Sequence, residues 1–241
     1  WGLTEKGLRY KTEITYVTPL SGAFTKPICS NVFGDLLKTK NIQVVTDFAT
    51  ARIDNETHKL VSWDDREVSY DLLVTIPTNM GDQMVARSGL GDELNFIPTD
   101  KHTLQSKKHQ NIFVIGDATD LPASKAGSVA HFQAEVLTEN ILNWIDGKPL
   151  SAQFDGHANC FIETGFGKAF LIDFNYDLEP VPGTYPIPHI GPLSLLKETR
   201  LNHLGKRAFK SIYWHMLLKA RTLQGISHKM SYDGKEILTK K

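Results

Sequence analysis

The sequence predicts an α/β fold. Short segments rich in β-branched residues alternate with stretches of helical periodicity, which is the pattern of β-α-β units. In one block, 111–140, an apolar strand leads into Gly-Asp, a loop and a helix. In α/β proteins this order brings backbone groups and a carboxylate to a nucleotide-like ligand. A chain of 241 residues with ordinary globular composition can form one large domain or two small ones.

The first part of the chain has the pattern of the second half of a dinucleotide-binding-type domain, whose first β-α-β unit is missing. We therefore predict a domain over 1–95. Its expected elements are strand 13–19, helix 31–40 with Asn31 as N-cap, strand 41–47, a hairpin of 59–63 and 67–70 around Asp64-Asp65, and a buried strand 72–76 that ends at Pro77.

The block 111–140 belongs to a second α/β domain, predicted over 96–150. Strand 112–115 runs into Gly116 and Asp117, and a loop with Lys125 precedes a helix over about 128–145. The glycine allows close backbone approach, and the carboxylate can accept hydrogen bonds from ligand hydroxyls. The helix start offers unpaired N–H groups and positive potential. We expect the packed face of the helix to consist of Ala130, Ala134, Leu137 and Ile141.

From Ser151 the composition changes, and we predict a third region over 151–241. Strands 160–164 and 168–174 form a hairpin around Gly165-Phe166-Gly167, and the prolines of 180–192 predict an irregular loop. Residues 193–221 predict one or two amphipathic helices, which Gly205 can separate. Their apolar stripe is Ala208, Ile212, Tyr213 and Met216, and Lys206, Lys210 and Lys219 lie off it.

Charge is unevenly distributed. The formal net charge is zero, yet residues 191–241 hold 11 Lys and Arg against 3 Asp and Glu. A basic tail with nearby aromatic residues is typical of an interfacial helix, so it predicts a membrane surface as partner, against the plainer alternative of a solvated helix face. No recognition motif supports nucleic acid. No apolar run approaches the ~20 residues that span a bilayer.

The two cysteines, Cys29 and Cys160, form no CxxC motif and no Cys/His metal spacing, so neither a disulfide framework nor a metal site is predicted. From the residues alone, each is most simply a small buried hydrophobe. Reactivity would require a thiolate, whose environment the sequence does not reveal.

Four segments resemble a known family: 70–78 (YDLLVTIPT), 96–105 (FIPTDKHTLQ), the Gly116-Asp117 block, and 158–176 (ANCFIETGFGKAFLIDFNY). Together they are similar to the sulfide:quinone oxidoreductases, Rossmann-like flavoproteins with two dinucleotide-binding domains. The implied fold is therefore part of such a flavoprotein, followed by a C-terminal β-hairpin and amphipathic helices.

The resemblance implies FAD as cofactor. Asp117 would bind the ribityl or ribose hydroxyls, and Gly116 would permit the approach. The amides around Gly127 and Ser128 would face the N1/C2=O edge of the flavin, where negative charge collects on reduction. Lys125 would add to that stabilisation, or would be a solvated loop lysine.

The resemblance also implies the chemistry. Cys160 would be a redox thiol that forms a disulfide with an upstream cysteine, sulfide would be oxidised through a persulfide, and electrons would pass through FAD to a quinone. Cys29 is not expected to be the partner. The protein would be a peripheral membrane protein, and a homo-oligomer is left open. Alternatives are a type II NADH:quinone dehydrogenase or related NAD(P)H-dependent FAD reductase, and a non-catalytic binding remnant.

The chain begins with Trp1 and contains no GxGxxG loop, which the family places near its N-terminus for the FAD pyrophosphate. We therefore expect it to be the C-terminal part of a longer protein.

Overall fold

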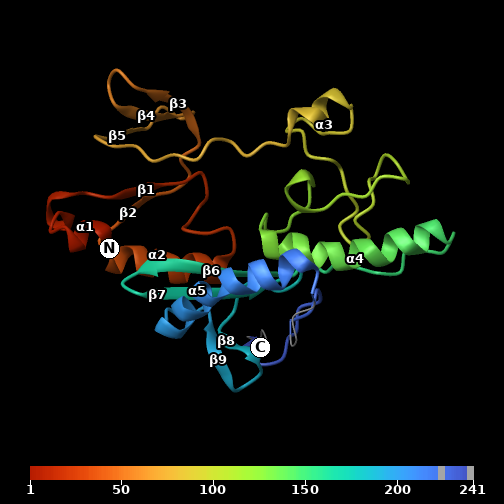
Figure 1. The fold of residues 1–241 in the computed structure, drawn as a ribbon. Helices are drawn as coiled ribbons and strands as arrows, with labels where there is room; N and C mark the ends of the chain where they lie inside the picture. The colour runs from red at the N-terminus through yellow and green to blue at the C-terminus, as the bar shows by residue number, and fades with distance from the viewer. Residues whose placement is uncertain (222–225, 238–241) are drawn as a thin grey trace. The chain divides into compact units, whose positions relative to one another are not determined.

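The computed structural model describes residues 1–221 and 226–237 and shows a mixed α/β chain (Figure 1). The chain divides into two compact units, Trp1–Thr78 and Asn79–Lys241. The predicted division into 1–95, 96–150 and 151–241 stays a prediction.

Unit 1 is built on a β-α-β unit. Strands β1 (Thr15–Val17) and β2 (Gln43–Val45) pair in parallel, and α2 (Pro27–Thr39) connects them. Cys29 and Phe33 of α2 are buried. The helix begins at Pro27, four residues before the predicted N-cap Asn31, because proline fits the first turn, where its missing N–H has no partner to lose. The chain begins with α1 (Gly2–Glu5) and η1 (Arg9–Lys11).

The second half of unit 1 is a three-stranded antiparallel sheet in the order β3-β4-β5. The predicted hairpin is present as β4 (Lys59–Ser62) and β5 (Glu67–Ser69), and β3 (Thr50–Asp54) was not predicted. The predicted buried strand 72–76 is wrong: this segment is in no strand, and Leu72, Val74 and Ile76 are 83%, 87% and 90% exposed. An apolar run becomes a strand only when a neighbour pairs with its backbone, and no described segment does so here.

Unit 2 opens with α3 (Gln83–Arg87), followed by irregular chain that leads to η2 (Gly116–Ala118) and α4 (Gly127–Ile145). The predicted strand 112–115 is also wrong, because its only β-bridge among the described residues joins Phe113 to Gln105. Packing holds this segment instead, since Val114 lies in a small core with Val85 and Ile97.

Helix α4 confirms the predicted helix but buries a different face. The buried positions are Val129, Phe132, Gln133, Val136 and Asn140, whereas the predicted positions are only partly buried. The core beneath α4 joins it to Leu104, Leu121 and Phe154. Two amides therefore lie on the packed face, which a count of apolar residues could not anticipate.

The main sheet of unit 2 has the order β6-β7-β9-β8. The predicted hairpin is β6 (Ala158–Gly165) with β7 (Lys168–Phe174). The predicted irregular loop 180–192 is wrong, since it contains β8 (Gly183–Ile187) and the start of β9 (Gly191–Leu195). Pro186 of β8 lies opposite Pro192 of β9, and β8 is an edge strand, where a missing donor is tolerated.

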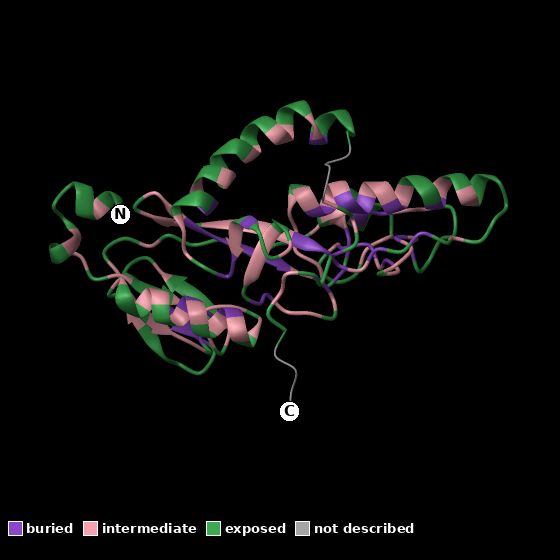
Figure 2. Cartoon of the chain, turned by 90° about the horizontal axis from the view of Figure 1, so that it is seen from below, coloured by how far each residue is buried: buried purple, intermediate pink, exposed green. Residues whose placement is uncertain are grey.

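Helix α5 (Arg200–His215) and the short η3 (Leu217–Lys219) account for the predicted C-terminal helices, although 193–195 belong to β9. Thr199 caps α5 by accepting a hydrogen bond from the N–H of Asn202 at 3.0 Å. Gly205 lies within the helix and does not break it, and Ala208 is exposed, contrary to prediction. In Figure 2, exposed residues (green) and partly buried residues (pink) alternate along α5.

No helix in the described part of the chain is long and apolar enough to cross a membrane.

Candidate functional site

The Gly116-Asp117 turn is fixed on both sides. Gly116 has φ +67, a conformation that favours glycine, and its N–H donates to Oε1 of Gln133 at 2.6 Å. On the other side, the Thr119 hydroxyl donates to the Gly116 carbonyl at 2.9 Å, and the N–H of Ile97 donates to the Ala118 carbonyl at 2.8 Å. The turn therefore presents Asp117 from a well-held backbone.

Asp117 itself is exposed, and among the described residues its carboxylate receives no hydrogen bond and forms no ion pair. Its acceptor oxygens are thus available to a ligand. Lys125 is the nearby cation. Burial lowers the pKa of its ammonium group, and the charges of Asp117, Asp120 and Asp92 oppose this effect.

The Lys125 ammonium already has partners. It donates to the Thr119 carbonyl at 2.6 Å and lies 4.5 Å from the centre of the Phe96 ring. These contacts close the loop between the turn and α4. A direct role of Lys125 toward a cofactor stays a prediction.

The first turn of α4 is uncapped. Ala126 at the N-cap has no side chain that can accept a hydrogen bond, and no described acceptor pairs with the N–H groups of Gly127, Ser128 or Val129. Gly127 is exposed, and the Ser128 hydroxyl donates to the Asn159 carbonyl at 3.3 Å. A 19-residue helix adds partial positive charge at this end. The site thus offers donors and a positive field to an electron-rich group.

Cys160 lies beside this helix start. It follows Asn159 on β6, and its Sγ is 3.9 Å from the Ser124 hydroxyl, three residues before Gly127. Burial raises the pKa of the thiol, while the Ser124 contact and the charge of Lys206 oppose the rise. Cys160 forms no disulfide, and neither does Cys29, which is completely buried as a packing residue would be.

Helix α5 packs close to both the start of α4 and strand β6. A Cβ placed on Gly127 would lie 3.9 Å from the Tyr213 ring, and one on Gly205 would lie 3.1 Å from the Phe161 ring. Gly205 thus permits α5 to pack closely over the strand that holds Cys160. Helix α5 and η3 together form an open groove of about 600 Å³, lined by Arg207, Lys210, Ser211, Trp214, His215 and Lys219.

Sequence reasoning missed Gln133, Ser124 and the approach of Lys206. Gln133 left one signal: it is a polar residue on the same helical face as Val129 and Val136. The sequence contains no such signal for Ser124 and Lys206, because packing of separate elements brings them close to Cys160.

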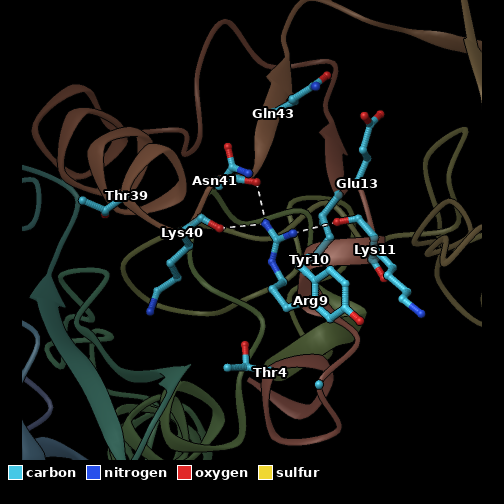
Figure 3. A pocket seen from close by; sticks show the side chains of 12 residues that line it. Thr4, Arg9, Tyr10, Lys11, Glu13, Thr39, Lys40, Asn41 and Gln43 are labelled. Carbon is cyan, nitrogen blue, oxygen red and sulfur yellow. Dashed lines mark hydrogen bonds between the residues drawn. The ribbon is translucent and has the colours of Figure 1, made fainter.

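A second cavity, of about 850 Å³, lies in unit 1 between η1 and the end of α2 (Figure 3). Its most prominent group, the Arg9 guanidinium, donates to the carbonyls of Thr12 (2.6 Å), Lys40 (2.9 Å) and Asn41 (2.6 Å). Because backbone carbonyls occupy its N–H donors, this guanidinium joins the segment after η1 to the end of α2.

Comparison with known proteins supports the predicted resemblance. No family model matches the chain. Mitochondrial sulfide:quinone oxidoreductase of Schizosaccharomyces pombe is 32% identical over 153 residues, which are 64% of this chain and 33% of the relative. That of Dictyostelium discoideum is 27% identical over 91% of this chain and 48% of the relative. The chain is similar to the sulfide:quinone oxidoreductases over most of its length. It spans about a third to a half of the length of these relatives.

A solved structure confirms the predicted fold class. Sulfide:quinone oxidoreductase of Aquifex aeolicus superposes with a TM-score of 0.71 over 91% of this chain and 53% of that one, at 20% identity. At this identity the likeness concerns the fold. Strands, helices and their order in the present chain therefore match about half of a sulfide:quinone oxidoreductase.

Proposed function

We propose that the protein is an FAD-dependent oxidoreductase of the sulfide:quinone type. The observation that carries the proposal is the placement of one thiol, Cys160, beside an uncapped helix start that follows a Gly-Asp turn with a free carboxylate. The similarity to mitochondrial sulfide:quinone oxidoreductases supports the same assignment.

The donor set fits FAD. Asp117 supplies acceptors for the ribityl or ribose hydroxyls, and the positive φ of Gly116 sets the direction in which that carboxylate projects. The free N–H groups of Gly127 and Ser128 match the electron-rich N1/C2=O edge of a flavin. Bound FAD would supply a two-electron acceptor, and these amides would stabilise the negative charge that reduction places on it.

Cys160 would act as a sulfur nucleophile and electrophile in turn. In a disulfide that includes Cys160, attack by hydrosulfide forms one S–S bond, yielding a cysteine persulfide, and releases the other cysteine as a thiolate. Once a nucleophilic acceptor has taken the outer sulfur of the persulfide, the two cysteine thiols would close the disulfide again and release two electrons. Bound FAD would supply the acceptor for these electrons, and a quinone would be the final acceptor. The Ser124 hydroxyl and the Lys206 ammonium favour the thiolate form of Cys160 against the effect of its burial.

Membrane association through α5 belongs to the same proposal, because a quinone is lipid-soluble. The groove on α5 combines Arg207, Lys210 and Lys219 with Trp214, which is 57% exposed. Exposed Leu204 and Leu218 lie on the same helical segment. This combination suits an interfacial helix on a peripheral protein. The relatives named above favour sulfide over NADH as the electron donor, so we do not propose the NADH-dependent alternative.

Replacing the thiol tests the proposal. In the full-length protein, Cys160→Ser should reduce sulfide-dependent flavin reduction to background in a stopped-flow absorbance assay, since serine cannot form the persulfide. Cys29→Ser is the matched control, and it should keep the native rate because Cys29 is a buried packing residue. Bleaching of the flavin at the native rate in the Cys160 variant would refute the thiol role.

A further inference from the structure

Gln133 is a buried polar side chain that joins two parts of the candidate site. It lies on α4, is 2% exposed, and accepts the Gly116 N–H at 2.6 Å across 17 residues of sequence. Apolar residues flank it on the packed face of the helix. An amide in such a position is costly unless it forms hydrogen bonds, so its presence requires an explanation.

The bond holds the backbone next to Asp117 and so influences where its carboxylate lies. The Ile97 N–H holds the Ala118 carbonyl after Asp117, and the Thr119 hydroxyl holds the Gly116 carbonyl. Among the described residues, Gln133 is the one that holds the N–H of Gly116, just before Asp117. Gln133 is also less than two helical turns from Gly127, so the distance along the rigid helix to the free amides is about 9 Å. One helix therefore connects the carboxylate side of the site to its N–H side.

We propose that Gln133 is a positioning residue, whose side-chain amide fixes the Asp117 carboxylate relative to the first turn of α4 and so sets the spacing of the two parts that bind FAD. The inference rests on the proposed function. Without the acceptor, the partly buried Gly116 N–H loses its partner, and the turn relaxes to find another.

The test uses three variants of the full-length protein. Gln133→Met removes the acceptor with little change in side-chain volume, and Gln133→Glu retains a carbonyl acceptor. Asn140→Met is the matched control, because Asn140 is a buried amide on the same helix whose bonds go to Thr103 and Ala152, away from the turn. For each variant, FAD affinity is measured on the apoprotein by quenching of flavin fluorescence.

We expect Gln133→Met to weaken FAD binding roughly tenfold, the effect of one lost hydrogen bond. Gln133→Glu should recover most of the affinity. Asn140→Met should lower the melting temperature but leave the FAD affinity of the folded protein unchanged. Equal FAD affinity in the Met variant and the wild type would overturn the inference, as would an equal loss in the Asn140 control.

Hydrogen exchange of the Gly116 amide supplies a readout that does not need the cofactor. In the apoprotein this amide should exchange faster in Gln133→Met than in the wild type, and the Asn140 control should leave it protected. Unchanged protection in the Met variant contradicts the positioning role even if the variant binds FAD poorly. A wild-type protein that protects Gly116 in this way but binds no FAD would instead refute the proposed function.

Discussion

The carboxylate of Asp173 lies between two basic side chains inside unit 2. Its Oδ2 accepts from the Lys235 ammonium at 2.5 Å, its Oδ1 pairs with Nε2 of His157 at 2.8 Å, and all three side chains are nearly inaccessible. Burial alone would raise the pKa of this carboxyl, but the hydrogen bond and charge of His157 and the charge of Lys235 hold it below its ordinary value.

Removing this charge should destabilise the protein. Asp173→Asn leaves Lys235 buried without a counter-ion, so we expect a loss of about 3–5 kcal/mol in the free energy of unfolding at pH 7. A carboxyl with a depressed folded-state pKa contributes stability above its unfolded pKa, about 3.9, and loses it as pH falls through the folded value. The difference between variant and wild type in urea denaturation should therefore shrink below about pH 4.

The exposed pair Lys148–Asp146 provides the control. Lys148→Ala should change the free energy of unfolding by less than about 1 kcal/mol, because solvent screens this pair. A comparable loss in both variants would show that burial of the Asp173 pair is unimportant.

At the scale of elements, the local sequence pattern predicted those helices and hairpins whose backbone hydrogen bonds lie within a short stretch of chain. Helix α4, the α2 crossover and the hairpins β4-β5 and β6-β7 follow from periodicity and turn residues within a short stretch. Segments 72–76 and 112–115 failed because a strand depends on a distant partner. In the site, Gly116, Asp117 and the start of α4 are local features, whereas the contact of Gln133 with Gly116 depends on packing.

Two helical glycines allow an element-scale prediction. Gly34 in α2 has open space where a Cβ would lie, so Gly34→Ala should stabilise the protein by about 0.5–1 kcal/mol through helix propensity. At Gly205 a Cβ would lie 3.1 Å from the Phe161 ring, so Gly205→Ala should not stabilise the protein. The larger Gly205→Val should lower the free energy of unfolding by about 1–3 kcal/mol. Urea denaturation of the three variants measures the contrast. An equal gain for both alanine variants would mean that α5 is not tightly packed on β6.

The distribution of charge is a property of the whole molecule. A chain of zero net charge has 11 basic and 3 acidic residues over 191–241, and part of this excess lines the groove on α5. The outward face of that helix also exposes large apolar side chains. Such a surface is expected to bind an anionic bilayer more strongly than a neutral one.

Neutralising the groove tests the membrane proposal. The combined change of Arg207, Lys210 and Lys219 to Gln should weaken cosedimentation with vesicles of anionic phospholipid by roughly 100-fold, at about 1 kcal/mol for each charge. The same change at Lys6, Lys38 and Lys148, which are exposed and lie outside α5 and η3, should have a much smaller effect. Equal losses of vesicle binding in the two triple variants would mean that binding depends on the net charge of the protein and not on the groove, which contradicts the proposal.

The outer edge of β8 has a consequence for self-association. Residues 234–236 bond to it, since the Thr184 N–H donates to the Gly234 carbonyl at 3.0 Å and the Glu236 N–H donates to the Pro182 carbonyl at 2.9 Å. Further along, Pro186 offers no N–H at all. Because residues 234–236 and Pro186 leave few free backbone groups along this edge, a strand from another molecule cannot pair with it. The segment 234–236 therefore prevents polymerisation through β8.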